Sequence, residues 1–248
     1  MKQSVKLIAG NWKMNGLAAD LAEVQTLHDA LADEPASCRV AICPPSTLIT
    51  RMAAPAGALI EIGGQDCRAE AGGAFTGGVS AAMLRDAGAG LVIVGHSERR
   101  QEFGESDALV ASKAEAAAEA GLQPIICVGE TLAQREAGEA VEVVRRQVMH
   151  SLPLAVAGKP FAVAYEPVWA IGTGLTPTLE QIEEVHRAVR GAMIERLGLA
   201  VATVPILYGG SVKPDNAREI LATPEVGGAL VGGASLKAKD FLAIIQAV

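Results

Sequence analysis

The sequence predicts a single-domain α/β protein, a (β/α)8 barrel in which eight parallel strands close into a cylinder surrounded by helices. Eight short apolar runs rich in β-branched residues recur along the chain, and each is followed by a longer segment of helical composition. No linker or change of composition divides the 248 residues. About 250 residues is the usual size of one such barrel. We therefore expect one domain spanning residues 1–248.

The expected strands are nearly continuous apolar runs, as parallel strands covered on both faces are. In chain order they are Val5–Ala9, Arg39–Cys43, Leu59–Gly63, Leu91–Gly95, Pro124–Val128, Phe161–Tyr165, Pro205–Tyr208 and Ala229–Val231. An open doubly wound sheet would more naturally have about five or six strands, with a G-x-G-x-x-G loop after the first. Because the first strand here runs into Gly10-Asn11-Trp12-Lys13, a closed barrel is favoured.

The segments after the strands carry helix-forming residues with apolar side chains at helical spacing. These segments are Leu17–Leu31, Ser46–Ala54, Ser80–Ala87, Asp107–Ala120, Leu132–His150, Thr178–Leu197, Pro214–Leu221 and Lys237–Ala247. Thr178 and Gln181 have the spacing of a capping box, and Gly121 and Gly198 stand where helices commonly end. One helix is therefore expected after each strand.

The composition excludes several classes of protein. Hydrophobic residues make up 50% of the chain and charged residues 20%, which excludes a disordered chain. A net charge of −7 without a Lys/Arg-rich run argues against nucleic-acid and membrane partners. The chain has no apolar run typical of a membrane span or secretion signal, and its four scattered cysteines read as reduced cytoplasmic thiols. The four histidines lack zinc-ligand spacing, so no metal is expected.

Glycine pairs follow the last two strands, at Gly209-Gly210-Ser211 and Gly232-Gly233. Active sites of α/β barrels lie at the carboxyl ends of the strands, and their phosphate sites are common after the seventh and eighth. Glycine lets backbone N–H groups approach a phosphate closely, and a short helix beginning near Gly232 would direct its N-terminus at the same anion. One pair alone is more often a tight turn, but two on neighbouring strands favour a phosphate site.

Three side chains at other strand ends offer acid–base groups and positive charge. Glu166 is either a surface carboxylate or, if partly buried, a stronger base than water allows. His96 is either a packed structural histidine or a neutral hydrogen-bond donor, since Ser97 is suited to cap a helix whose N-terminus disfavours a second ring proton. Lys13 is either an ordinary exposed lysine or the cation that an anionic substrate needs. Residues 167–174 combine apolar side chains with glycines, as a hinged lid would.

Taken together, these motifs closely resemble those of the triosephosphate isomerase family. The matching segments are Ala9-Gly-Asn-Trp-Lys-Met-Asn15, Gly95-His-Ser-Glu-Arg-Arg100, Ala164-Tyr-Glu-Pro-Val-Trp-Ala-Ile-Gly-Thr-Gly174, Tyr208-Gly-Gly-Ser211 and Leu230-Val-Gly-Gly-Ala-Ser235. The resemblance covers essentially the whole chain. It implies a TIM barrel that interconverts dihydroxyacetone phosphate and D-glyceraldehyde 3-phosphate in glycolysis and gluconeogenesis, without a cofactor.

The resemblance also implies a role for each matching residue. Glu166 is the base that moves a proton between adjacent carbons through an enediol(ate), and His96 is the neutral electrophile at the substrate oxygens. Lys13 and Asn11 bind and polarise the substrate. The backbone of four further residues holds the phosphate: Gly172, Ser211, Gly232 and Gly233.

The segment Gln65–Ser80 resembles the protruding interface loop of the family, in which Thr76 reaches towards the neighbouring subunit's site. The resemblance therefore implies a homodimer. Asp66 stands where an asparagine is common in the family, which leaves the detail of this interface open.

Two other functions are weighed against this one. The first is another phosphate-binding barrel, such as a sugar-phosphate epimerase, which would want paired His and Asp metal ligands at strand ends that this sequence lacks. The second is a catalytically silent barrel that only binds a phosphorylated metabolite. The presence of Glu166, His96 and Lys13 together argues against the silent barrel.

Overall fold

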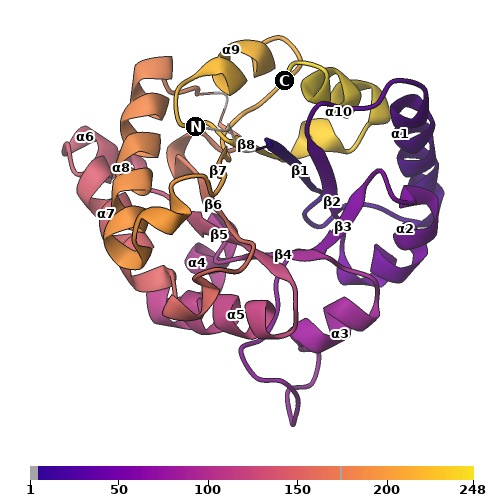
Figure 1. The fold of residues 1–248 in the computed structure, drawn as a ribbon, viewed down its shortest axis with the longest axis horizontal. Coiled ribbons are helices and arrows are strands. Elements are labelled where there is room, and N and C mark those ends of the chain that lie inside the picture. Colours follow the sequence, from indigo (N-terminus) through magenta and orange to yellow (C-terminus); the bar gives the residue numbers. More distant parts are fainter. Residues whose placement is uncertain (1–4, 174) are drawn as a thin grey trace.

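The predicted closed (β/α)8 barrel is confirmed by a computed structural model, which describes residues 5–173 and 175–248. Each strand pairs in parallel with its neighbours in sequence, and β1 pairs with β8 to close the cylinder. Figure 1 shows the helices as an outer ring around the strands. The strands are β1 (Leu7–Asn11), β2 (Arg39–Cys43), β3 (Glu61–Gly64), β4 (Leu91–Val94), β5 (Gln123–Val128), β6 (Ala162–Tyr165), β7 (Ile206–Tyr208) and β8 (Gly228–Val231).

Helices follow the strands along the chain. The α-helices are α1 (Leu21–Asp33), α2 (Ile49–Ala56), α3 (Ala81–Asp86), α4 (Ser97–Phe103), α5 (Asp107–Glu119), α6 (Leu132–Glu136), α7 (Ala140–Ser151), α8 (Leu179–Leu197), α9 (Ala217–Ala222) and α10 (Ala238–Ile245). Short 3-10 turns are η1 (Ala18–Asp20), η2 (Ser46–Leu48), η3 (Leu154–Val156), η4 (Val168–Ala170), η5 (Leu199–Val201) and η6 (Gly233–Ser235). None of the described helices is both long and apolar enough to cross a membrane.

Some element boundaries differ from the prediction. The expected single helix over 132–150 is two helices, α6 and α7, because Gly138 between them adopts a left-handed backbone with φ of +74°. β1 starts and ends two residues later than expected, so Asn11 is its last residue. α4 was too short to show a helical period in the sequence, and its N-cap is His96 instead of Ser97. The polar ends of elements are thus harder to locate than their apolar centres.

The expected capping signals are confirmed. The side chain of Thr178 accepts a hydrogen bond from the backbone N–H of Gln181, whose side chain accepts one from the N–H of Thr178. Gly121 and Gly198, at the ends of α5 and α8, have φ of +78° and +83°. These left-handed residues end the helices before β5 and the β7 region begin.

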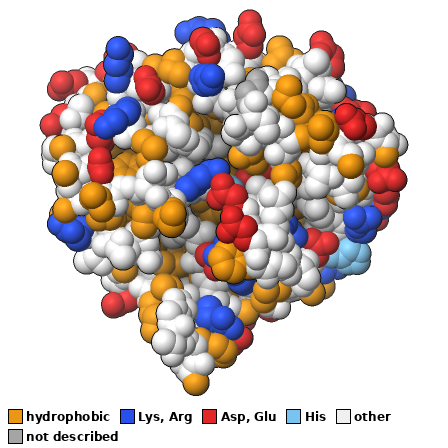
Figure 2. All heavy atoms as spheres, turned by 180° about the vertical axis from the view of Figure 1, so that it is seen from behind, with side chains coloured by type: hydrophobic (Ala, Val, Ile, Leu, Met, Phe, Trp, Pro, Cys, Tyr) orange, Lys and Arg blue, Asp and Glu red, His pale blue; other side chains and the backbone are white. Residues whose placement is uncertain are grey.

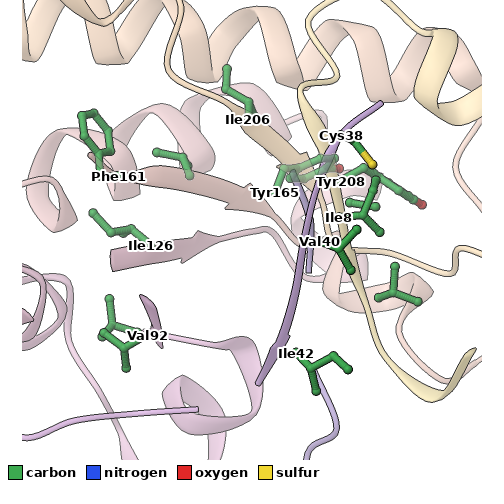
Figure 3. Packing of buried hydrophobic residues seen from close by; sticks show 14 of the residues in the cluster. Ile8, Cys38, Val40, Ile42, Val92, Ile126, Phe161, Tyr165, Ile206 and Tyr208 are labelled. Carbon is green, nitrogen blue, oxygen red and sulfur yellow. The ribbon is translucent and has the colours of Figure 1, made fainter. Parts of the chain in front are cut away.

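Both faces of the barrel strands are buried, which explains why their sequences are nearly continuously apolar. One cluster, from alternate strand positions, fills the barrel interior: Leu7, Ala9, Ala41, Cys43, Leu91, Ile93, Ile125, Cys127, Ala162, Ala164, Leu207 and Leu230. The intervening residues pack outward against the helices. Figure 3 shows Ile8, Val40 and Ile126 of this outer cluster. The two layers fix the strand ends that carry the polar residues.

The chain between β3 and α3 projects from the barrel, as Figure 1 shows, and the projection is visible from the other side in Figure 2. On the face shown in Figure 2, acidic and basic side chains are interspersed and form no continuous basic surface.

Gly228 provides a test of barrel closure. Its φ is +145°, and an added Cβ would lie 1.9 Å from the carbonyl oxygen of Leu7 on β1. Gly228→Ala should therefore destabilise the fold by at least about 2 kcal/mol, because the backbone of two paired strands must move. Gly191 lies inside α8, and beyond the backbone of that helix no atom in the described part of the chain lies within 4 Å of its Cβ position. Gly191→Ala should therefore stabilise the fold by about 0.5–1 kcal/mol. Urea unfolding of the wild type and both variants measures these changes in stability. Unfolding midpoints equal to that of the wild type would contradict the prediction.

Candidate active site

A cavity of about 370 Å³ lies at the carboxyl ends of the strands. Its lining includes eight of the residues expected from the sequence: Asn11, Lys13, His96, Glu166, Gly172, Ser211, Gly232 and Gly233. They come from the ends of β1, β4, β6, β7 and β8 and from the chain that follows each strand. Thr76 differs from these eight, because it is exposed on the projecting segment. It lines an adjoining cavity of about 760 Å³ that shares Lys13 and His96 with the first.

Glu166 directly follows β6, and its side chain is almost completely buried, with a relative exposure of 2%. Its Oε1 lies 2.8 Å from Nε2 of His96. Its Oε2 accepts a hydrogen bond of 3.0 Å from the backbone N–H of Ser97. The carboxylate thus joins the end of β6 to the first turn of α4, which follows β4.

His96 is the N-cap of α4, and it is also buried. Its Nδ1 accepts a hydrogen bond of 3.2 Å from the backbone N–H of Glu98. Because Nδ1 is an acceptor, the hydrogen-bond geometry assigns a ring proton to Nε2, and the Nε2–H donates a hydrogen bond to Glu166. The N-terminus of α4 also disfavours a second positive charge at this place. These two contacts favour the neutral form of the imidazole, and the adjacent carboxylate of Glu166 favours its charged form.

The two buried groups shift one another's pKa. Burial raises the pKa of the Glu166 carboxyl, but contacts from His96 and the N–H of Ser97 outweigh it and bring the pKa below its usual 4.5. Burial lowers the pKa of His96, and the neighbouring Glu166 raises it, with a net rise above 6.5. That rise comes mainly from Glu166, so the N–H of Glu98 and burial favour the neutral ring once the carboxylate moves away.

Lys13 adopts a backbone conformation that is costly for a residue with a side chain, with φ of +52°. Such strain costs on the order of 1 kcal/mol and is typical of functional sites. Two hydrogen bonds hold it: the N–H of Lys13 donates to Oδ1 of Asn11 at 3.0 Å, and Nε2 of Gln65 donates to the carbonyl of Lys13 at 2.8 Å. The Nζ of Lys13 lies 2.6 Å from Oε1 of Glu98.

The glycines at the ends of β7 and β8 serve two different purposes. An added Cβ on Gly209 would lie 2.9 Å from Cγ of Glu166, so glycine there leaves room for the carboxylate. An added Cβ on Gly233 would have no atom of the described residues within 4 Å. Packing within the protein therefore does not require glycine at position 233. Close approach of a ligand to the backbone is a reason for glycine there. The short η6 turn begins at Gly233 with Gly232 as its N-cap, where the sequence predicted a short helix.

The predicted lid segment begins with Pro167 and the η4 turn. Nε1 of Trp169 donates a hydrogen bond of 2.9 Å to Oε1 of the buried Glu130. Ile171 and Gly172 line the cavity, and Gly172 is exposed with φ of +70°. Gly174, the last residue of the predicted lid, lies outside the described residues.

Several residues that contact the catalytic side chains were not assigned a catalytic or binding role from the sequence. Glu98 and Lys13 are 85 positions apart, and no local pattern links them. Ser97 contributes a backbone N–H to Glu166. Any residue type provides such a group, so the identity of residue 97 could not have predicted this contact. Gln65 was read only as the start of the interface segment, although its place directly after β3 could have marked it as facing the cavity.

The cavity offers a carboxylate, an imidazole, an ammonium group and the backbone of several glycines. This set suits proton transfer on an anionic substrate. Within residues 5–173 and 175–248, no group of three or more His, Cys, Asp or Glu side chains is arranged to hold a metal ion.

Replacing His96 should raise the pKa of Glu166 above 4.5. His96→Leu removes the contacts that lower this pKa and keeps an apolar side chain over the carboxyl, so the effect of burial remains. Carbon-13 NMR of labelled glutamate carboxyls measures the titration, and Glu166→Gln assigns the signal. A pKa that stays below 4.5 in His96→Leu would show that His96 is not the cause.

The lowered pKa also predicts how stability depends on pH. The pKa of Glu166 is lower in the folded than in the unfolded protein, so the ionised carboxylate stabilises the fold above about pH 4.5. This contribution is lost as the pH falls through the pKa of the folded state. The unfolding free energies of wild type and Glu166→Gln should therefore converge on acidification. Urea titrations between neutral and acidic pH measure this difference, and a constant difference would contradict it.

Known proteins match this chain over nearly its whole length. A family model described as triosephosphate isomerase matches residues 6–248. The chain is 62% identical over 243 residues to the triosephosphate isomerase of Caulobacter vibrioides, with 98% of this chain and 96% of that protein covered. It is 58% identical over 243 residues to that of Ruegeria sp., with 98% of each covered.

A solved structure gives the same result. The crystal structure of triosephosphate isomerase from Bartonella henselae is similar with a TM-score of 0.91 and 44% sequence identity, and 98% of each chain is covered. Both the sequence and the fold therefore match over nearly their full extent, and the chain belongs to the triosephosphate isomerase family.

Proposed function

We propose that the cavity at the strand ends interconverts dihydroxyacetone phosphate and D-glyceraldehyde 3-phosphate, with the residues in the roles that the family resemblance implies. The observation that carries the proposal is the convergence of Glu166, His96 and Lys13 in one cavity of about 370 Å³. A volume of this size is suited to a small ligand such as a three-carbon phosphoester.

The first step is removal of a proton from the carbon next to the substrate carbonyl. Glu166 takes this proton, and the Nε2–H of His96 donates a hydrogen bond to the carbonyl oxygen as negative charge develops there. The resulting enediol(ate) receives the proton from Glu166 on the neighbouring carbon, while a proton moves between the two oxygens. The atoms of substrate and product balance, so no other reactant is needed.

The hydrogen bonds of Glu166 explain how one carboxylate can be stable at rest and basic with substrate bound. At rest, His96 and Ser97 stabilise its negative charge. When the Nε2–H of His96 donates its hydrogen bond to the substrate instead, Glu166 loses that stabilisation but remains shielded from water. Burial alone raises a carboxyl pKa, so the freed carboxylate is a stronger base.

Stabilisation of the enediolate oxygens comes from groups that are already in position. His96 is oriented by the N–H of Glu98, and Lys13 is fixed by Asn11 and Gln65. Preorganised donors of this kind lower the barrier because they do not have to reorient as charge develops. The backbone at Gly172, Ser211, Gly232 and Gly233 holds the phosphate, and the lid over 167–174 keeps water from the intermediate.

We also infer that the protein is a homodimer working in the cytoplasm, where glycolysis takes place. Met14 and Phe103 are 97% and 65% exposed, and both line the cavity of about 760 Å³ beside Lys13 and His96. A second copy's projecting segment, with Thr76 at its exposed end, would cover these apolar side chains. The four cysteines are free and buried, as suits a reducing compartment.

The proposed reaction is tested with purified, EDTA-treated protein and dihydroxyacetone phosphate. We expect formation of glyceraldehyde 3-phosphate with uptake of solvent deuterium on carbon. Glu166→Gln should lower kcat by about 10²–10⁴-fold, because the base is lost. Glu142→Gln, an exposed position on α7, is the matched control and should leave kcat unchanged.

Three outcomes of this assay discriminate among the functions. Activity that the chelator abolishes would favour a metal-dependent epimerase. Binding of substrate without product or deuterium exchange would favour a silent barrel. Full activity in Glu166→Gln would remove Glu166 from its proposed role.

The dimer is tested by sedimentation at micromolar concentration. The wild-type protein should have twice the chain mass of 25.5 kDa. Thr76→Arg should shift it towards the monomer, because a long charged side chain would be forced into the partner's cavity. Thr26→Arg, at an exposed position on α1, should remain dimeric. A wild-type protein that sediments only as a monomer would contradict the assignment of Gln65–Ser80.

A further inference from the structure

Lys213 lines the phosphate side of the catalytic cavity, next to Ser211, and the proposed mechanism does not use it. Its side chain is exposed, and it forms no ion pair with any residue that the structure describes. Most exposed lysines are simply solvated, so position alone does not give Lys213 a function. The surrounding hydrogen bonds and charges distinguish it.

The turn that carries Lys213 is fixed to the phosphate-side loop. The backbone N–H of Lys213 donates to Oδ1 of Asn216 at 2.8 Å, and Nδ2 of Asn216 donates to the carbonyl of Ser211 at 3.1 Å. Asn216 thus holds Lys213 at a constant place relative to Ser211. The ammonium end remains free to follow an approaching anion.

Apart from Lys213, the charged side chains around the cavity attract a distant phosphate only weakly. Lys13, the other cation in the cavity lining, lies 2.6 Å from the carboxylate of Glu98, which offsets its charge. Glu166 adds a negative charge, and the whole chain carries a net charge of −7. This net charge disfavours the long-range approach of a phosphate dianion, and Lys213 is the lysine in the cavity lining whose charge no described carboxylate offsets.

We propose that Lys213 attracts the substrate's phosphate to the cavity and accelerates its binding. This inference rests on the proposed function, and it adds a residue that acts before the chemical step. Because the ammonium acts through solvent, its effect must weaken as salt shortens the range of electrostatic attraction. The effect should appear in kcat/KM, which includes the encounter with substrate, far more than in kcat.

Lys159 provides a matched control. It is also exposed and forms no ion pair with a described residue, but it lies just before β6 begins, at the end of the barrel opposite the cavity. Replacing either lysine by glutamine changes the net charge by the same amount. A difference between the two variants therefore reports position and not net charge.

The test measures kcat and KM for glyceraldehyde 3-phosphate at ionic strengths of about 0.01 M and about 1 M. Lys213→Gln should lower kcat/KM by about three- to tenfold at low salt and by less than about twofold at high salt, with kcat changed by less than about twofold. Lys213→Arg should restore kcat/KM. Lys159→Gln should match the wild type, and unphosphorylated glyceraldehyde should be processed equally by all four proteins.

Three results would overturn the inference. They are an unchanged kcat/KM for Lys213→Gln at low salt, a loss of the same size at both ionic strengths, and an equal loss for Lys159→Gln. A wild-type protein without isomerase activity would overturn the proposed function itself. An active wild type with an unaffected Lys213→Gln variant would overturn this inference alone.

Discussion

The hydrogen bonds that Glu166 accepts from His96 and the N–H of Ser97 hold an ionised carboxylate in a place that is almost inaccessible to water. A buried carboxylate without such partners would take up a proton and lose its value as a base. The same contacts fix the first turn of α4 against the end of β6. The ring position of His96, the resting charge of Glu166 and the relative place of two strand ends therefore depend on one another.

Polar groups behind the cavity support this arrangement. Glu130 is fully buried, and its Oε1 accepts hydrogen bonds from Tyr165 and Trp169 at 3.0 and 2.9 Å, with Arg135 beside it. Tyr165 directly precedes Glu166, and Trp169 belongs to the lid segment. Tyr165 and Tyr208 lie side by side in Figure 3, with ring centroids 6.4 Å apart, which links the end of β6 to that of β7. Glu166, the segment around Trp169 and the end of β7 thus share one buried support.

The aspartate at position 66 is accommodated by cations. Its carboxylate lies 2.8 Å from Nζ of Lys113 and 3.0 Å from Arg99, and the same two cations contact Glu105. Burial raises the pKa of Asp66, and Lys113 and Arg99 oppose this rise. Because Arg99 lies on α4, this cluster connects the base of the projecting segment to the helix whose N-cap is His96. An aspartate at this position is therefore stabilised by two ion pairs within the same chain.

The sequence alone determined the barrel, because eight apolar runs buried on both faces leave a parallel closed sheet as the natural solution, and hydrophobic periodicity is a local property. It also located the strand ends and so indicated that Asn11, Lys13, His96 and Glu166 would face one cavity. The motif resemblance, and not periodicity, supplied their roles. The break between α6 and α7 and the N-cap of α4 were missed, since both depend on the conformation of a single residue.

Only the tertiary structure decided which partners these groups have. The pairing of Lys13 with Glu98, the support of Lys13 by Gln65 and the donation from Ser97 to Glu166 all join residues distant in sequence. Sequence patterns carry little information about such contacts, because they depend on strand register and on backbone atoms common to every residue. The charge state of Glu166 follows from those contacts, so it too was decided by the folded arrangement and not by the order of residues.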